Sequence, residues 1–243
     1  MVAGLTTSLA SAGFTTDTYV QFDVTSSNGD VSMFNEDGFQ SSAGGPVTFM
    51  GGSPFGQSNV AYTIGLSTQP EGSTLGGQLG TTDIAAFSIF VANTDTTTHY
   101  YTLAISIGIV DPWNQGTLVG GTVGGLLTDL DGGGATLSDA FGNPLMTGRI
   151  DEMGVLDVGV APFSFTAPAG GTTLFDVTDG LPGPTIPGPM DVNSSYGLLL
   201  TFALGAGDQV EIDGEFQVKY VPGPASLALL AMGMTVAGRR RRN

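Results

Sequence analysis

Near its carboxyl end the chain reads Val210-Glu211-Ile212-Asp213-Gly214-Glu215-Phe216-Gln217-Val218-Lys219-Tyr220, an alternation of apolar and polar residues. Successive side chains of a β-strand point to opposite faces, so the alternation predicts one buried face and one face in water. The carboxylates of Glu211, Asp213 and Glu215 would then lie on the wet face. Such a strand is typical of an antiparallel sheet that covers a core on one side.

Two hairpins are predicted around strands of this kind. The apolar run at residues 196–204 is separated from the alternating strand by the turn Gly205-Ala206-Gly207-Asp208. In the same way, residues 84–92 are separated from the alternating run 99–109 by the polar segment 93–98. Short polar connections between two strand-like runs indicate antiparallel hairpins.

The composition favours an all-β protein. The chain holds 39 glycines and only 12% charged residues, so the residues that surface helices need are scarce. Further short strands, each bounded by Gly, Pro, Asn or Asp, are predicted at residues 19–24, 47–50, 60–66, 155–160 and 163–166. We expect residues 13–220 to form one antiparallel β-sandwich of jelly-roll or immunoglobulin-like topology. The glycine-rich segment 116–148 and the proline-rich segment 182–189 are expected to be loops.

Charge is distributed very unevenly along the chain. Of the six basic residues, only Arg149 and Lys219 precede the last five positions, whereas all 22 acidic residues lie in the body. An acidic surface of this kind repels phosphate backbones, so nucleic acid is excluded as a partner of the body. The chain has no cysteine, so neither disulfides nor thiolate chemistry are available.

The first twelve residues resemble the end of a signal peptide. They finish in the cleavage-like pattern Ala10-Ser11-Ala12, but no Lys or Arg precedes it and the apolar run is interrupted by Thr and Ser. We interpret residues 1–12 as the remnant of a signal peptide whose basic front would be encoded upstream of Met1. The alternative is an ordinary terminal segment outside the fold.

The carboxyl terminus has three parts in a fixed order. After Tyr220 come Val221-Pro222-Gly223-Pro224-Ala225-Ser226, the apolar run 227–238, and then Arg239-Arg240-Arg241-Arg242-Asn243. Residues 225–238 would make a helix of about 21 Å at 1.5 Å per residue, which is short for a membrane span of about 20 residues. The arginines would remain on the cytoplasmic side and leave the β domain outside.

This order resembles the PEP-CTERM sorting signal, whose pattern is Pro-Glu-Pro, a short transmembrane stretch and an arginine-rich end. The resemblance covers residues 221–243, with Gly223 at the place where the family has Glu. It implies export, transient anchoring of the C-terminal helix in the membrane, and cleavage near Pro222, Gly223 and Pro224 by an exosortase-type membrane protease or transpeptidase. It further implies a cell-surface or extracellular location and an association with exopolysaccharide. A plain single-pass anchor or a buried apolar helix is the alternative.

Catalytic machinery is not evident, and we expect that the protein is not an enzyme and binds no cofactor. His99 is the one histidine of the chain, and no nucleophile elbow accompanies it, because Phe55 stands where the pattern around Ser53 needs Gly. We expect His99 to be a surface residue at a strand end. One histidine without cysteine also makes a zinc site implausible, so no metal ligand is assigned.

A weak calcium motif lies at residues 129–140. It begins like an EF-hand loop, but Ala140 stands at the twelfth place, where a bidentate Glu belongs. An irregular site of Asp129, Asp131 and Asp139 is the candidate, and a plain acidic turn is the alternative.

Two further candidate sites concern sugars. Trp113 follows a predicted strand and could stack on a glycan, although a hydrophobic plug at the edge of the core explains it as well. Asn193 lies in the sequon Asn193-Ser194-Ser195, preceded by Asp191, and is a candidate for glycosylation.

Three functions follow from these features. The first is an exported surface protein with a structural or adhesive role near exopolysaccharide. The second is a secreted carbohydrate-binding or glycan-hydrolysing sandwich, for which paired carboxylates at Asp151-Glu152 or Glu211, Asp213 and Glu215 are available. The third is a calcium-dependent adhesin, which would melt at a higher temperature in calcium.

Overall fold

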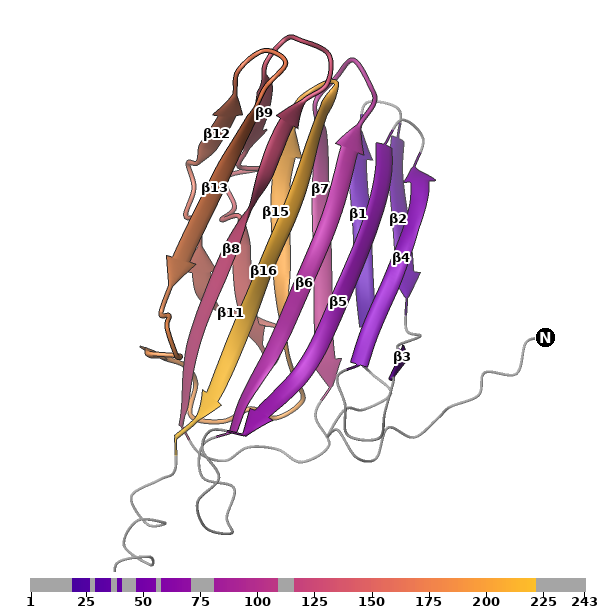
Figure 1. Cartoon of the computed structure of the whole chain (residues 1–243). Helices are drawn as coiled ribbons and strands as arrows, with labels where there is room; N and C mark the ends of the chain where they lie inside the picture. The colour runs from indigo at the N-terminus through magenta and orange to yellow at the C-terminus, as the bar shows by residue number, and fades with distance from the viewer. Residues whose placement is uncertain are drawn as a thin grey trace, which may run out of the picture.

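Two antiparallel β-sheets make up the part of the chain described by the computed structural model, which comprises residues 19–26, 29–35, 39–40, 47–55, 58–70, 81–108 and 116–221. No helix occurs among these residues, and all strand pairings are antiparallel (Figure 1). The predicted all-β, antiparallel class is therefore confirmed. The predicted C-terminal helix lies outside the described residues.

The first sheet has its strands in the order β11-β10-β15-β7-β1-β2, and β9 and β12 extend it beside one end of β15. Its members are β1 (Tyr19–Ser26), β2 (Gly29–Asn35), β7 (His99–Gly108), β9 (Ala135–Ser138), β10 (Met146–Ile150), β11 (Met153–Val158), β12 (Ser164–Ala167) and β15 (Ser195–Leu204).

The second sheet has the order β13-β8-β16-β6-β5-β4-β3, and the short β14 pairs with β8. Its members are β3 (Phe39–Gln40), β4 (Val47–Phe55), β5 (Ser58–Pro70), β6 (Thr81–Asn93), β8 (Thr117–Asp129), β13 (Thr172–Asp179), β14 (Ile186–Pro187) and β16 (Asp208–Tyr220).

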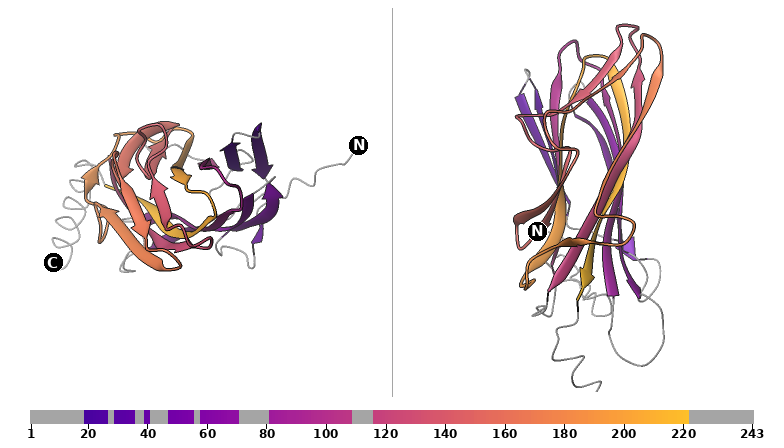
Figure 2. Two further views of the ribbon diagram at one scale, coloured as in Figure 1. Left: turned by 90° about the horizontal axis from the view of Figure 1, so that it is seen from above. Right: turned by 90° about the vertical axis from the view of Figure 1, so that its left-hand side faces the viewer.

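One hydrophobic core lies between the two sheets, which face each other when viewed from above (Figure 2). Large side chains from both sheets are fully buried in it, including Tyr101 and Phe202 of the first sheet and Ile89 and Phe216 of the second. Burial of each such side chain contributes roughly 1.5–3 kcal/mol, so this shared core is the main favourable term that holds the sheets together.

The alternating strand predicted at the carboxyl end is confirmed as β16. Val210, Ile212, Phe216 and Val218 are buried, whereas Glu211 and Asp213 are exposed. The weaker strands predicted elsewhere are present as β1, β4, β5, β11 and β12.

Both predicted hairpins are wrong. β6 and β7 belong to different sheets, as do β15 and β16, so residues 94–98 and 205–207 cross from one sheet to the other. A short polar connection can close a hairpin or turn a corner between sheets, and local periodicity does not distinguish the two outcomes. The partners of β16 are instead β6 and β8, which are distant in sequence.

The prediction that residues 116–148 form a loop is also wrong. This segment contains β9, the start of β10 and the 13-residue strand β8, which lies between β13 and β16. The glycines of β8 lie where other backbone approaches closely: a Cβ on Gly120 would come within 2.6 Å of the carbonyl oxygen of Gly180. Their frequency therefore reflects close packing, a recognised use of glycine within a strand. The segment predicted as a loop at 182–189 includes only the two-residue β14.

Four connections between the sheets lie side by side at one end of the molecule, and we call them the four arches: residues 168–171, 130–134, 205–207 and 94–98. Their order follows from the strand orders β12-β9-β15-β7 and β13-β8-β16-β6. Backbone hydrogen bonds join each arch, or the strand end next to it, to its neighbour. They run from Asp129 N to Gly171 O (3.0 Å), from Leu130 N to Gly207 O (3.2 Å) and from Gly207 N to Asp95 O (3.1 Å).

Candidate functional site

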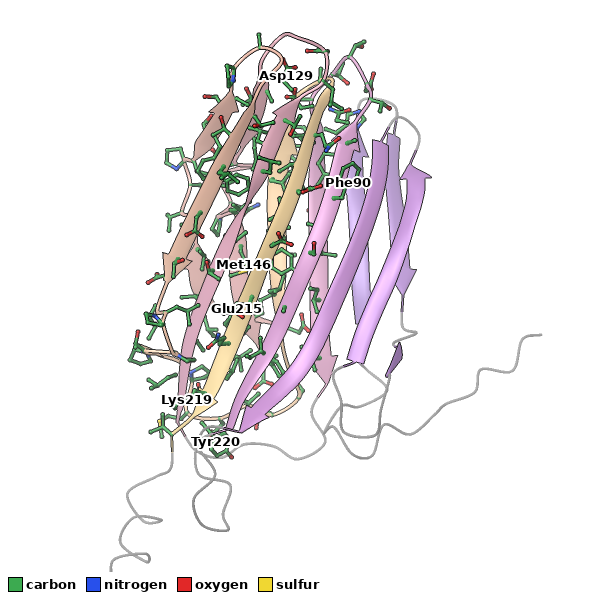
Figure 3. All side chains as sticks on the ribbon, viewed as in Figure 1. Phe90, Asp129, Met146, Glu215, Lys219 and Tyr220 are labelled. Carbon is green, nitrogen blue, oxygen red and sulfur yellow. The ribbon has the colours of Figure 1, made fainter. Side chains whose placement is uncertain are left out.

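Three aspartates meet at the four arches. Asp129 ends β8, Asp131 lies in the arch 130–134, and Asp208 begins β16 directly after the arch 205–207. Each offers a carboxylate oxygen, and these oxygens all lie within 4.8 Å of one another. Figure 3 labels Asp129 at this end of the sheets, opposite Tyr220. We call Asp129, Asp131 and Asp208 the aspartate cluster.

The Asp129 carboxylate is held by backbone N–H groups of two arches. Its Oδ1 accepts hydrogen bonds from Asp131 N and Gly132 N, both at 3.1 Å, and its Oδ2 accepts from Gly134 N at 3.1 Å and from Gly170 N at 2.5 Å. These donors, with Gly170 N–H first, lower the pKa of Asp129 to about 2. The group is therefore ionised at neutral pH and fixed in position.

Asp131 is the exposed member of the cluster. Its Oδ1 accepts a hydrogen bond from Gly133 N at 2.7 Å, while its carboxylate lies against Gly207 of the neighbouring arch. Gly207 has φ +69°, and a Cβ there would come within 2.7 Å of Asp131 Oδ2. Glycine therefore serves two purposes at this position: it adopts the left-handed backbone and leaves space for the carboxylate.

Asp208 is the buried member, with a relative exposure of 1%. Its Oδ2 accepts a hydrogen bond from Thr136 N at 2.9 Å, whereas its Oδ1 has no hydrogen-bond partner among the described residues. Burial, followed by the charges of Asp129 and Asp131, raises the pKa of Asp208 above its ordinary value despite the Thr136 N–H donor. An ionised carboxylate in this position is buried beside two other carboxylates, and a nearby positive charge would stabilise it.

The cluster differs from the calcium site predicted from the sequence. Asp129 and Asp131 are brought together, but Asp139 is not part of the cluster. The reason is that β9 intervenes: from Ala135 to Asp139 an extended strand rises about 13 Å. Asp208 was missed because it is distant in sequence and is brought to the site by the pairing of β16 with β8.

His99 is not the surface residue that the sequence predicted. Its exposure is 2%, and its Nε2 lies 2.9 Å from Oδ2 of Asp95, whose own exposure is 8%. Hydrogen bonds from His99 and from the backbone N–H of Thr96 lower the pKa of Asp95. Asp95 lies in the arch 94–98 and His99 begins β7 directly after it, so the pair is buried where the chain turns into the facing sheet.

Asn193 is exposed, as a glycosylation site requires, but its side chain is already engaged. Its Nδ2 donates to Asp151 Oδ2 at 3.0 Å, and the N–H groups of Asn193 and Ser194 donate to the same carboxylate. Burial raises the pKa of Asp151, but these donors outweigh it and leave the pKa lowered. Glycosylation of Asn193 stays a prediction.

A shallow groove of about 610 Å³ crosses the second sheet, lined by residues of β8, β13 and β16 that include Asp176, Glu211 and Asp213. The aromatic residue of its lining is Phe175, which is 7% exposed. An exposed ring on which a sugar could stack is therefore not found among the lining residues. Glycan binding stays a prediction.

The remaining predicted site residues lie outside the described residues. They are Trp113, residues 1–12, Pro222, Gly223, Pro224, Arg239, Arg240, Arg241 and Arg242. Within the ranges that the structure describes, no helix is long and apolar enough to cross a membrane.

Comparison with known proteins identifies no family, and no family model matches the chain. Two relatives, from Citrifermentans bemidjiense and from a Geobacter species, are phospho-N-acetylmuramoyl-pentapeptide-transferases that are 34% identical over 87 residues. The match covers 36% of this chain, and this chain spans about a fifth (22%) of the relatives' length.

Two solved viral structures align with this chain at low similarity. The structure of the infectious bursal disease virus Gx strain covers 90% of this chain, and 69% of its own chain is matched, at 11% identity and a TM-score of 0.14. A subviral particle of the same virus covers 92% of this chain, with 73% of its own matched, at 14% identity and a TM-score of 0.14. TM-scores of this size support no structural argument.

Proposed function

We propose that this chain is an exported surface protein of a bacterium, delivered by a C-terminal sorting signal that an exosortase-type enzyme removes. The body is a β-sandwich that serves a structural or adhesive role at the cell surface or in an exopolysaccharide matrix. It is not an enzyme, and its partners are the processing enzyme, the membrane before processing, and polysaccharide afterwards.

The observation that carries the proposal is the order of features at residues 221–243. A Pro-x-Pro element, a short apolar run and four arginines follow one another in the last positions of the chain. An apolar run of this length is short for permanent residence in a bilayer, which suits a signal that is held briefly and then removed.

The end of the body supports this arrangement. β16 finishes at Tyr220, and the next residue, Val221, is exposed while its N–H donates to Gly116 O at 2.8 Å. The Pro-x-Pro element thus starts one residue after the last contact that the structure describes. Proline has no backbone N–H with which to extend the β16 ladder, so a Pro-x-Pro element directly after the body suits a junction that a protease cuts.

The environment of His99 supports a non-enzymatic role. The ring is 2% exposed and bonded to Asp95, so the one histidine of the chain is not accessible to a substrate. The two facing sheets with a shared core support the sandwich architecture of the body.

Intact mass spectrometry of the protein from its native host tests the proposal. We expect a mature carboxyl end at Pro222, Gly223 or Pro224, without the four arginines. A strain that lacks the processing enzyme should retain the tail, and Pro222→Ala with Pro224→Ala should reduce processing. Full-length protein ending at Asn243 in the membrane of normal cells would mean that the tail is a plain anchor.

A further inference from the structure

Asp208 has a buried carboxylate oxygen that the rest of the described chain does not satisfy. Its Oδ1 is shielded from solvent and accepts no hydrogen bond from a described residue, while Oδ2 accepts one from Thr136 N. Leaving a polar oxygen unpaired in a buried place costs free energy, and an unpaired charge costs considerably more. A partner for Oδ1 must therefore come from outside the described chain.

The surroundings of Oδ1 increase this demand for positive charge. The neighbouring groups are the carboxylates of Asp129 and Asp131, which repel the charge on Asp208. The body contains only two basic side chains besides His99: Arg149 pairs with Glu152, and Lys219 is eleven residues further along β16, about 36 Å at 3.3 Å per residue. Figure 3 shows Lys219 at the opposite end of the sheets from Asp129.

The geometry of the aspartate cluster fits a cation of particular size and chemistry. Calcium takes oxygen ligands at 2.3–2.6 Å, so two oxygens on one ion lie up to about 5 Å apart, and the cluster offers three oxygens within 4.8 Å. Asp129 is held in position by four N–H donors, and Asp131 is exposed, which leaves one side open to water. Calcium completes its six to eight ligands with waters at such a site.

We propose that Asp129, Asp131 and Asp208 bind a calcium ion between the arches 130–134 and 205–207. Asp208 Oδ1, which accepts no hydrogen bond from the described residues, would coordinate this ion. The ion links two arches that are 70 or more residues apart in sequence, so it stabilises the end of the sheets at which all four arches meet. The site is independent of how the protein is exported.

Thermal unfolding and calorimetry of the full-length chain, purified in a mild non-ionic detergent and stripped with EDTA, test this assignment. Added calcium should bind with a stoichiometry of one and raise the melting temperature by about 5–10 °C at a hundredfold excess over its dissociation constant. Magnesium, which needs a tighter octahedral shell at 2.0–2.1 Å, should raise it less at the same concentration.

Three substitutions distinguish the site from general charge screening. Asp208→Asn should abolish the calcium-induced shift and leave the calcium-free melting temperature equal or higher, because it removes a buried like charge. Asp131→Asn alters an exposed side chain, so the variant protein should fold. Because it removes one carboxylate of the cluster, it should weaken calcium binding at least tenfold. Asp139→Asn, a nearby acid outside the cluster, should keep the wild-type shift.

The proposal fails if EDTA-stripped wild-type protein shows neither calcium-dependent heat nor a shift in melting temperature. It fails equally if Asp131→Asn and Asp139→Asn respond to calcium in the same way, because the ion would then not be at the cluster. If Asp208→Asn does not fold, the comparison of Asp131→Asn with Asp139→Asn alone decides.

Discussion

At the scale of single residues, the Asn93 side chain joins the arch 94–98 to the arch 205–207, which are more than a hundred residues apart in sequence. Its Nδ2 donates to Thr97 O (2.8 Å), Leu204 O (3.2 Å) and Gly205 O (2.8 Å), and its Oδ1 accepts from Asp95 N (3.0 Å). The side chain is 1% exposed, so these carbonyls have little access to water when the amide is removed.

We therefore expect Asn93→Ala to lower the free energy of unfolding by about 1–3 kcal/mol, measured by urea denaturation. The matched control is Asn143→Ala on an exposed turn, where a change within about 0.5 kcal/mol is expected. Equal effects of the two substitutions would show that the Asn93 amide does not stabilise the arches.

Asp129 determines part of the response to acid. Its pKa in the folded protein, about 2, lies below the ordinary value of 3.8, so its stabilising contribution is complete above that value. The contribution is lost as the pH falls from about 4 to about 2. In calcium-depleted buffer, Asp129→Asn should be less stable than wild type at pH 7 and should lose less stability on acidification through this window.

Asp208→Asn should change the response to acid in the opposite direction from Asp129→Asn, and it therefore serves as the control for this experiment. Burial raises the pKa of Asp208, so its ionised form destabilises the fold, and protonation at low pH relieves that cost. The Asn variant lacks this relief and should lose more stability than wild type on acidification. Parallel pH curves for the two variants would contradict both assignments.

At the scale of elements, β8 depends on glycines because neighbouring strands approach its backbone closely. A Cβ on Gly125 would overlap the carbonyl oxygen of Glu211 in β16 and come within 3.0 Å of Phe175 Cζ in β13. Overpacking of this kind typically costs 1–3 kcal/mol.

Gly125→Ala should therefore destabilise the protein by about 1–3 kcal/mol, seen as a lower urea midpoint with an unchanged slope. Gly116→Ala is the control, because a Cβ there would meet only Met190 Sδ at an ordinary 3.7 Å. A tolerated Gly125→Ala would mean that β8 and β16 can separate without cost.

At the scale of the whole molecule, the four arches lie at one end of the sheets, and Tyr220, the last residue of β16, lies at the other. Asp129 marks the first end and Tyr220 the second in Figure 3, and β16 runs the whole distance between them. Removal of the tail after Val221 would therefore leave the aspartate cluster and the core intact. The proposed processing and the proposed calcium binding can therefore be tested separately.

Several elements were predictable from local patterns. The buried face of β16 was evident from residues 210–220, and the glycine and charge content indicated the all-β class. Two of the three cluster residues, Asp129 and Asp131, were also candidates on sequence alone. The β8 strand was not predicted, because the glycines that suit it to close packing resemble those of a loop.

The sequence by itself determined that residues 210–220 form a strand and which of its faces is buried, because that periodicity is a local property of adjacent side chains. Only the tertiary structure decided which strands pair, that the polar segments after β6 and β15 cross between sheets, and that Asp208 joins Asp129 and Asp131. The decisive pairings join strands far apart in sequence, such as β16 with β6 and β8, and a local pattern carries no information about distant partners.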